Sequence, residues 1–303
     1  MVGDSGLGKS PLLYQLAICV AAGIPFLGRT VLKGTVLFLD FENGIAQVDE
    51  IITTQSRYLG LQGPPANLLL WNANDAPAKW DGTGYGFLEL IKDFQPTLVI
   101  IDSLNVFKPE AEEKSSIAAR FYKELRTLIR ECRTTFLCVL HLKKDSDKPD
   151  YKRPPLEDSD VHDWFRAVRG TRALVNNSDV RLGIDRPGQI TEIVGNDGSK
   201  EQVALVVRGF GRVRGEIPTT YIARVLNEDG DPIGHKRVCG LQLLLNSEQR
   251  SLYEKLPDRF RFKDVRLYYQ KSDSAVTAFL KKCVGLGILK KAEGHYEKVA
   301  IPE

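Results

Sequence analysis

Long hydrophobic runs are missing from this sequence of 303 residues, and so are paired cysteines. No apolar stretch approaches the roughly 20 residues of a membrane-spanning helix, and the N-terminus does not resemble a secretory signal. The five cysteines are scattered without a C-x-x-C pair, which is typical of small core residues in a reducing compartment. We therefore expect a cytoplasmic protein without a membrane partner.

A strong charge of one sign is also missing, since the formal net charge is only +3. Residues 246–303 hold 12 lysines and arginines against 8 acidic residues, whereas the rest of the chain holds 30 against 31. A basic excess in the tail is compatible with a nucleic-acid partner, and equally with an ordinary solvated surface. Internal repeats are absent as well, and the length suits one large and one small domain.

What the sequence does contain is a glycine-rich motif near its start, of the form G-x-x-x-x-G-K-[ST]. Its eight residues are Gly3, Asp4, Ser5, Gly6, Leu7, Gly8, Lys9 and Ser10. Glycines let the backbone turn with positive φ, so that successive N–H groups converge on phosphate oxygens. The lysine reaches the β- and γ-phosphates, and the serine hydroxyl ligates Mg²⁺. The motif therefore predicts a site for ATP with Mg²⁺, followed by a helix over residues 10–22.

The strand that should lead into such a loop is largely missing, because only Met1 and Val2 precede Gly3. We expect this strand to be absent or reduced to a stub. The neighbouring strands would then have backbone N–H and C=O groups without hydrogen-bond partners in the core, and each such group lowers the stability by about 1 kcal/mol or more. One hypothesis is that Met1 is a misassigned start codon, or that the reading frame is truncated. A stop codon directly upstream of Met1 in the DNA would contradict it.

Two carboxylates lie at the end of the next apolar run, residues 34–42, which is typical of a buried parallel strand. Ligands bind at the carboxyl ends of such strands, so Glu42 is the candidate for orienting or deprotonating the attacking water. Two alternatives remain open. Glu42 caps the following helix, expected over residues 45–59, or Asp40 is the base instead.

Two later strand ends also carry polar residues. Four apolar residues at 98–101 precede Asp102, a Walker B pattern in which the aspartate holds Mg²⁺ through a water molecule. The strand expected over residues 134–140 ends at His141, which either senses the γ-phosphate or is an ordinary core histidine. Both positions point to the same edge of one parallel sheet as Glu42.

Four blocks together resemble the RecA-like P-loop ATPases: GDSGLGKS at 3–10, VLFLDFENG at 36–44, LVIIDS at 98–103 and FLCVLH at 136–141. The resemblance, strongest to the RepA-type replicative helicases and their AAA-family relatives, covers roughly residues 1–226. It implies catalytic roles for Glu42 and His141 beside Lys9, and the Walker B role for Asp102. The chain departs from the pattern in its missing first strand and in having His141-Leu142 where RepA-like proteins often have two histidines.

The stretch between the last of these blocks and the tail is less distinctive. Residues 143–158 are rich in proline and charge and predict a loop, which is either plain disorder or, in a ring-shaped ATPase, a channel-facing segment. A helix is expected over 160–176, and strands over 179–185, 201–208 and 221–226. Arg166, Arg169 and Arg172 are candidates for a finger that reaches a neighbouring subunit's γ-phosphate, although structural arginines are commoner.

The tail predicts helices over 247–256 and 262–269, a third from Ser272, and a hairpin around Glu293-Gly294, with Ser247 as the first N-cap. This order resembles a winged helix, in which the third helix enters the DNA major groove. The polar residues expected to face DNA are Lys271, Ser274, Thr277, Lys281 and Lys282, with Lys290 and Lys291 on the wing. A protein–protein module is the alternative.

The sequence thus predicts an α/β protein with a RecA-like P-loop core over residues 1–240 and a winged-helix domain over 246–303. The implied function is an ATPase coupled to DNA, of the replicative helicase or DNA-remodelling type, acting as a homo-oligomeric ring. The alternative is an ATP-gated DNA-binding regulator with slow hydrolysis. A degenerate fragment without activity is a third interpretation if the first strand is truly absent.

Overall fold

The computed structural model describes residues 1–72, 85–143, 153–187, 192–194, 200–213, 215–238, 241, 245–285 and 288–299. The chain divides into two compact units, Met1–Gly188 with Ala204–Arg237, and Gln189–Val203 with Val238–Glu303. The predicted domain limits at residues 240 and 246 stay a prediction.

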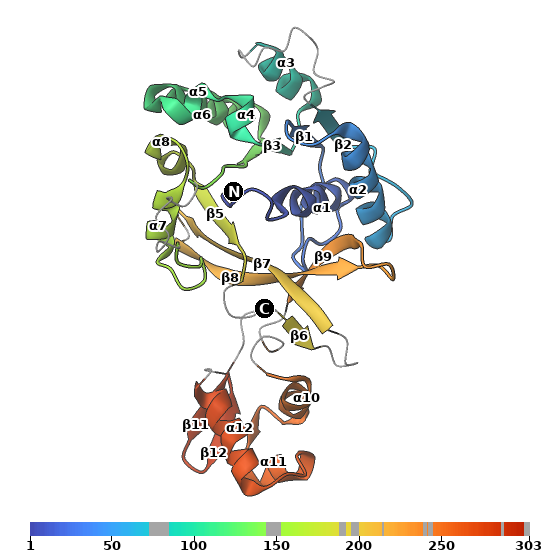
Figure 1. Ribbon diagram of the computed structural model, residues 1–303, viewed down its shortest axis with the longest axis vertical. Helices are drawn as coiled ribbons and strands as arrows, with labels where there is room; N and C mark the ends of the chain where they lie inside the picture. Colours follow the sequence, from blue (N-terminus) through green and yellow to red (C-terminus); the bar gives the residue numbers. More distant parts are fainter. Residues whose placement is uncertain are drawn as a thin grey trace. The chain divides into compact units, whose positions relative to one another are not determined.

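The first unit is built on a parallel sheet of four strands in the order β2-β1-β3-β4 (Figure 1). The strands are β1 (Val36–Asp40), β2 (Leu68–Asn72), β3 (Leu98–Asp102) and β4 (Thr135–Cys138). Every residue of β1 and β3 is buried, as expected when helices cover both faces of a parallel sheet. The predicted α/β class is confirmed.

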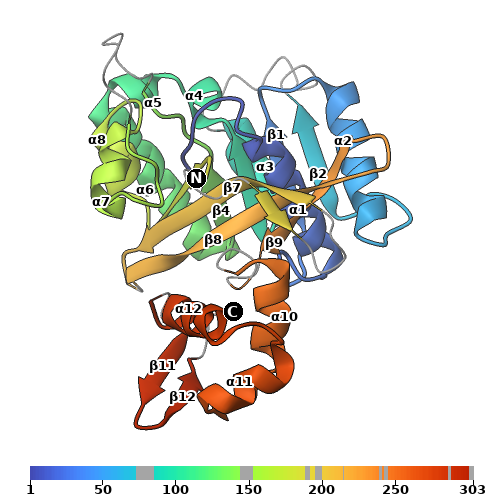
Figure 2. The same cartoon turned by 60° about the horizontal axis from the view of Figure 1, so that its bottom comes forward.

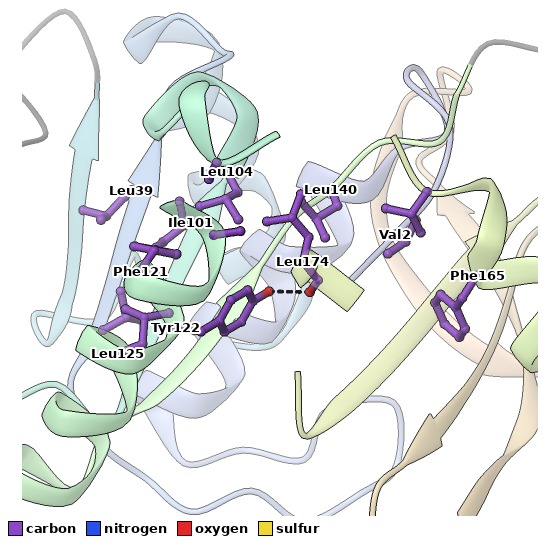
Figure 3. Packing of buried hydrophobic residues seen from close by; sticks show 14 of the residues in the cluster. Val2, Leu39, Ile101, Leu104, Phe121, Tyr122, Leu125, Leu140, Phe165 and Leu174 are labelled. Carbon is purple, nitrogen blue, oxygen red and sulfur yellow. Dashed lines mark hydrogen bonds between the residues drawn. The ribbon is translucent and has the colours of Figure 1, made fainter. Parts of the chain in front are cut away.

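Helices cover the two faces of this sheet (Figure 2). Alternate residues of a strand point to opposite faces, so Phe38 and Ile100 join the core of α1 (Lys9–Ala22) and α2 (Ile45–Tyr58). Leu39 and Ile101 join the opposite core, formed with α3 (Tyr85–Phe94) and α6 (Ser115–Cys132). Figure 3 shows that second core and the hydrogen bond, 2.7 Å long, from Tyr122 Oη to the Leu174 carbonyl.

The first strand survives as a stub, as the sequence predicts. Val2 forms parallel bridges to both Leu140, just past β4, and Gly183 of β5 (Val180–Asp185). The N–H of Val2 donates to the Leu182 carbonyl at 2.8 Å, and the N–H of Leu140 donates to the Met1 carbonyl at 2.8 Å. A single residue therefore joins the parallel sheet to the strands that follow.

A second sheet continues from β5 in the order β5-β7-β8-β9. Its other strands are β6 (Glu192–Val194), β7 (Lys200–Gly211), β8 (Gly215–Leu226) and β9 (Pro232–Val238), with β6 paired antiparallel to β7. Strands β5, β7 and β8 were predicted from their apolar content, although β7 and β8 are longer than expected. The sequence did not predict β6 or β9.

Short helices precede α6 and follow β4. They are α4 (Leu104–Phe107), α5 (Glu110–Glu113), α7 (Val161–Trp164), the 3₁₀ turn η1 (Phe165–Ala167) and α8 (Arg172–Asn176). The single helix predicted over residues 160–176 is wrong. The chain is already extended at Val168, which bridges Leu142, and it then turns at Gly170 with φ +90°, where a Cβ would lie 3.0 Å from the Glu112 Cα.

The tail has the predicted order of three helices and a hairpin. The elements are α10 (Ser247–Lys255), β10 (Arg259–Phe260), α11 (Phe262–Tyr268), α12 (Asp273–Gly285), β11 (Leu289–Ala292) and β12 (His295–Lys298). They enclose a core of their own that includes Val265, Val276 and Phe279. The predicted N-cap at Ser247 is wrong, because the Asn246 side chain accepts the N–H of Gln249 at 2.8 Å.

Candidate nucleotide-binding site

The glycine-rich loop runs from the Val2 stub into α1, and its glycines are required for different reasons. Gly6 and Gly8 have φ of +75° and +89°, which side chains other than glycine rarely adopt. Gly3 is required by space, because a Cβ would lie 2.6 Å from both the Cγ2 and the carbonyl oxygen of Ile184. The loop is thus anchored against β5 at one end and opens into the helix N-terminus at the other.

Lys9 lies inside the curve of this loop, with only 5% of its surface exposed. Its Nζ donates to the Gly3 carbonyl at 3.1 Å and to the Asp4 carbonyl at 2.6 Å. Burial lowers the pKa of Lys9, although the nearby carboxylates of Asp102 and Glu42 oppose that shift. A lysine ammonium group held inside a glycine-rich loop is the arrangement expected around triphosphate oxygens.

Asp102 faces the loop from the end of β3 and fits a cation. Ser10 hydrogen-bonds to the Asp102 carboxyl group, whose Oδ2 is buried without a hydrogen-bond partner. Burial raises the pKa of Asp102 to about 6, with the Asp40 and Glu42 charges adding to the shift. An unsatisfied buried carboxylate oxygen beside a serine hydroxyl suits Mg²⁺, which takes few protein ligands besides substrate phosphates. Among the described residues, no group of three or more His, Cys, Asp or Glu side chains is placed to hold a metal ion.

Glu42 lies just past β1, next to the β3 end. Its Oε1 accepts a hydrogen bond from Ser103 Oγ and lies 3.0 Å from His141 Nε2. Burial alone would raise the pKa of Glu42, but these two hydrogen bonds outweigh it and the pKa is lowered. About a third of the Glu42 side chain remains exposed, so the carboxylate is ionised and accessible to water.

His141 connects Glu42 with the glycine-rich loop. Its Nδ1 lies 3.3 Å from Ser5 Oγ, while its Nε2 lies 3.0 Å from Glu42 Oε1. The side chain is only 10% exposed. The structure therefore brings together Ser5, Glu42 and His141, which the sequence placed on three separate segments.

Asp40, the alternative base, is fully buried and has other partners. The N–H groups of Glu42 and Asn43 donate to its Oδ1 at 3.0 and 2.9 Å, and Tyr14 Oη donates to its Oδ2. These bonds tie the start of the turn after β1 to α1. Both carboxylate oxygens of Asp40 are therefore engaged in structural hydrogen bonds. Of the two candidates, Glu42 is the better one for a base that faces a reacting water.

Three contacts of this site were not predicted. Ser103 directly follows Asp102 in the sequence, so its position at a strand end was a usable signal for its bond to Glu42. Arg153 Nη2 lies 2.7 Å from Asp4 Oδ2, and Arg224 Nη2 donates to the Leu7 carbonyl at 3.4 Å. No local pattern indicates these two arginines, because each comes from a segment distant in sequence.

The predicted finger arginines lie away from these contacts. Arg166 pairs with Asp163 at 3.2 Å and Arg169 with Glu112 at 3.2 Å, both with more than half of the side chain exposed, and Arg172 is exposed. Of the predicted loop over 143–158, residues 144–152 lie outside the described part of the chain.

The tail exposes the polar side chains that the sequence singled out. Lys271, Ser274, Thr277, Lys281, Lys282, Lys290 and Lys291 are all exposed. Lys271 pairs with Glu248, and Lys282 Nζ donates to Gln249 Oε1 at 2.9 Å. Both bonds connect α10 to the region of α12.

The first unit thus combines an α/β fold with a candidate nucleotide-binding site at its glycine-rich loop. Residues 1–147 match the model of a family described as an AAA domain. This match covers just under half of the chain and includes the glycine-rich loop. Among curated proteins, none matches the chain.

One similar solved structure is the crystal structure of the RadB recombinase, at 16% sequence identity and a TM-score of 0.46. The alignment covers 78% of this chain and 89% of that chain. A similarity of this size is too weak to support a conclusion about fold or function. In the part of the chain that the structure describes, no helix has the length and apolar character needed to cross a bilayer.

Proposed function

We propose that this chain is an ATPase that binds ATP with Mg²⁺ at residues 3–10 and couples hydrolysis to movement on DNA or to its remodelling, as in replicative helicases. The observation that carries the proposal is the position of Glu42. Its carboxylate lies beside the Walker B strand end and is linked through His141 to Ser5 of the loop. A carboxylate held in this way can orient or deprotonate a water next to a γ-phosphate.

Positioning and charge neutralisation supply most of the catalysis in this proposal. The amides after Gly3 and the N-terminus of α1 hold the phosphates, and Lys9 neutralises the β- and γ-phosphate oxygens. Ser10 and Asp102 hold Mg²⁺, which when bound supplies further positive charge to the phosphate oxygens. Glu42 accepts a proton from the attacking water or orients it.

DNA binding is assigned to the tail as a winged helix. Its exposed lysines on α12 and β11 give a surface suited to phosphates, and the excess of basic residues lies in this part of the sequence. We further propose that subunits form a ring in the cytoplasm, with an arginine from a neighbouring subunit completing the ATP site. Arg166, Arg169 and Arg172 are the candidates, and their exposure supports such a role.

A second candidate is an ATP-gated DNA-binding regulator with slow hydrolysis. The two hydrogen bonds on Glu42 favour it, because they lower the pKa of the carboxylate and make it a weaker base. In that case bound ATP controls the assembly of the protein or its affinity for DNA, and ATP hydrolysis only returns the protein to its nucleotide-free form.

The two functions differ in how ATP turnover responds to DNA. We would measure the ATPase rate with and without single-stranded DNA, with a Lys9→Ala chain as the blank for nucleotide binding. A large stimulation supports a motor. A slow, unresponsive rate with ATP-dependent DNA affinity supports the regulator, and absence of MgATP uptake by calorimetry would overturn both. Mass measurement with a non-hydrolysable ATP analogue tests the ring.

A further inference from the structure

The strand β2 ends in a polar side chain that the protein encloses. β2 is the first strand of the parallel sheet and lies next to β1 (Figure 1). Its last residue, Asn72, is the register partner of Asp40 on β1, which in turn is the partner of Asp102 on β3. Asn72 is only 2% exposed. Burying an amide side chain costs free energy unless it is hydrogen-bonded, so the bonds that Asn72 makes indicate its role.

Asn72 holds the turn that carries Glu42. Its Nδ2 donates to the Asn43 carbonyl at 2.5 Å. From β1, Asp40 Oδ1 accepts the N–H of Glu42 at 3.0 Å and the N–H of Asn43 at 2.9 Å. Three consecutive peptide groups are thus held, the first two by Asp40 and the third by Asn72. Because each peptide group is planar, these bonds fix the backbone on both sides of Glu42 and just beyond it.

The helix that follows this turn brings no side-chain cap of its own. α2 begins at Ile45 with Gly44 as its N-cap, and glycine has no side chain to accept the orphan N–H groups of the first helical turn. The path of the chain between β1 and α2 therefore depends on bonds from other segments. The bond from Asn72 reaches the backbone at the far end of the turn, directly before Gly44.

We propose that Asn72 is a positioning residue for Glu42, acting through the Asn43 carbonyl. The role rests on the proposed function, because Glu42 is there the group that acts on the attacking water. Asn72 does not have to touch the nucleotide, since a displacement of about 1 Å at a reacting group costs about 100-fold in rate. Loss of its bond should reduce ATP turnover and leave the affinity for MgATP, which depends on residues 3–10, unchanged.

Asn67 provides the matched control at the other end of the same strand. It directly precedes β2, and its Nδ2 donates to the Ala21 and Gly34 carbonyls at 2.9 and 2.8 Å. Asn72→Leu and Asn67→Leu each remove one amide that bonds backbone carbonyls, so both should lower the unfolding temperature. Only Asn72→Leu should lower kcat, by about 10-fold or more, at an unchanged Kd for MgATP in calorimetry.

Asn72→Asp separates positioning from packing. The side chain keeps its shape but donates to the Asn43 carbonyl only when it is protonated. Burial and the neighbouring Asp40 charge raise the pKa of a carboxyl group at this position. We expect turnover, relative to the parent chain at the same pH, to be about 10-fold lower at about pH 8 and to rise towards the parent value at about pH 6. Asn72→Leu and Asn67→Asp should show no such rise.

A double variant separates this role from the proposed function. In a Glu42→Gln chain, Asn72→Leu should cause no further loss of turnover, because the group that it positions no longer acts. Normal turnover in Glu42→Gln alone would overturn both the proposed base and the role of Asn72. A slow Glu42→Gln chain together with normal turnover in a folded Asn72→Leu chain would overturn only the role of Asn72. If Asn72→Leu does not fold, the pH dependence of Asn72→Asp decides, and a turnover ratio that stays constant with pH would contradict the proposal.

Discussion

The Nε2 atom of His141 lies 3.0 Å from the Oε1 atom of Glu42, so one imidazole ring connects the proposed base with the P-loop. The other ring nitrogen lies 3.3 Å from Ser5 Oγ. A γ-phosphate bound at the loop would compete with His141 for the Ser5 hydroxyl or would reorient that hydroxyl. The His141 ring would then shift, and its contact with Glu42 would change with it. His141 is thus a positioning residue for Glu42 in the proposed mechanism.

Replacing His141 with alanine should reduce ATP turnover by about 10- to 100-fold, because Glu42 loses one of the two groups that orient it. Binding of MgATP should change little, since the contact of the ring with the loop is to the Ser5 hydroxyl and not to a backbone amide. Steady-state kinetics gives the turnover and calorimetry gives the affinity. A rise in turnover would instead indicate that the histidine restrains Glu42, as expected for the slowly hydrolysing regulator.

A Glu42→Gln chain should bind MgATP normally but hydrolyse it at least about 100-fold more slowly, because glutamine cannot accept the proton of the attacking water. The matched variant is Asp40→Asn, in which the buried anchor and not the proposed base is altered. We expect that variant to lose stability in thermal unfolding, through its bonds to Tyr14 and the turn after β1. Normal turnover in Glu42→Gln would move the base elsewhere.

The sequence predicted the helix and strands around the candidate site where apolar runs and glycine spacing mark them along the chain. The loop at residues 3–10 and the apolar runs that end at Glu42 and Asp102 are recognisable locally, because apolar runs indicate buried strands and glycine spacing indicates phosphate loops. Asp40 and Asp102 prove to be register partners on neighbouring strands. That pairing follows once both strands are placed in one parallel sheet.

Contacts between distant segments could not be predicted in the same way. Arg153 lies 149 residues from Asp4, and Arg224 lies 217 residues from Leu7, so neither pair leaves a periodic trace. The helix expected over 160–176 failed for a related reason. Apolar spacing suggested one helix, but the bridge between Val168 and Leu142, a tertiary contact, holds the chain extended after Ala167.

Gly3→Ala should destabilise the first unit by about 1–3 kcal/mol, because the added methyl group meets Ile184 atoms at 2.6 Å, one of them backbone. Gly63→Ala is the control. No atom lies within 4 Å of a Cβ at that position and its φ is not positive, so a gain of up to about 1 kcal/mol is expected. Denaturant unfolding measures both changes, and equal stability of the two variants would contradict the close packing of the loop against β5.

His235 should make the protein less stable in mild acid. The ring is 4% exposed, its Nδ1 has no partner, and burial, with the Arg224 charge, lowers the pKa to about 4. Below pH 6.5 the unfolded chain binds a proton on this ring that the folded chain does not, so stability falls from pH 6.5 towards pH 4. Between about pH 7 and about pH 5 this loss is about 2 kcal/mol.

The variant that isolates this effect is His235→Phe, which keeps a ring of similar size. Gln15 bonds the backbone of residue 235, at 2.7 and 2.8 Å, and those bonds remain. Urea unfolding in neutral and mildly acidic buffer should therefore show a smaller loss in the variant than in the parent chain. An identical loss in both chains would mean that the imidazole is protonated as readily in the folded state as in the unfolded state.

The tail lysines provide the sharpest test of DNA binding. Lys281→Ala with Lys282→Ala removes two exposed charges from α12, and alanine preserves the helix. We expect the slope of log affinity against log salt to fall by about 2, because each duplex phosphate that a lysine neutralises adds about 0.9 to that slope.

The control removes Lys123 and Arg130 from the exposed side of α6 and should leave the slope unchanged. Fluorescence anisotropy across a salt series measures both. Equal slopes in the two double variants would assign the tail to a protein partner, because a winged helix that contacts DNA through α12 must release counterions when those lysines bind.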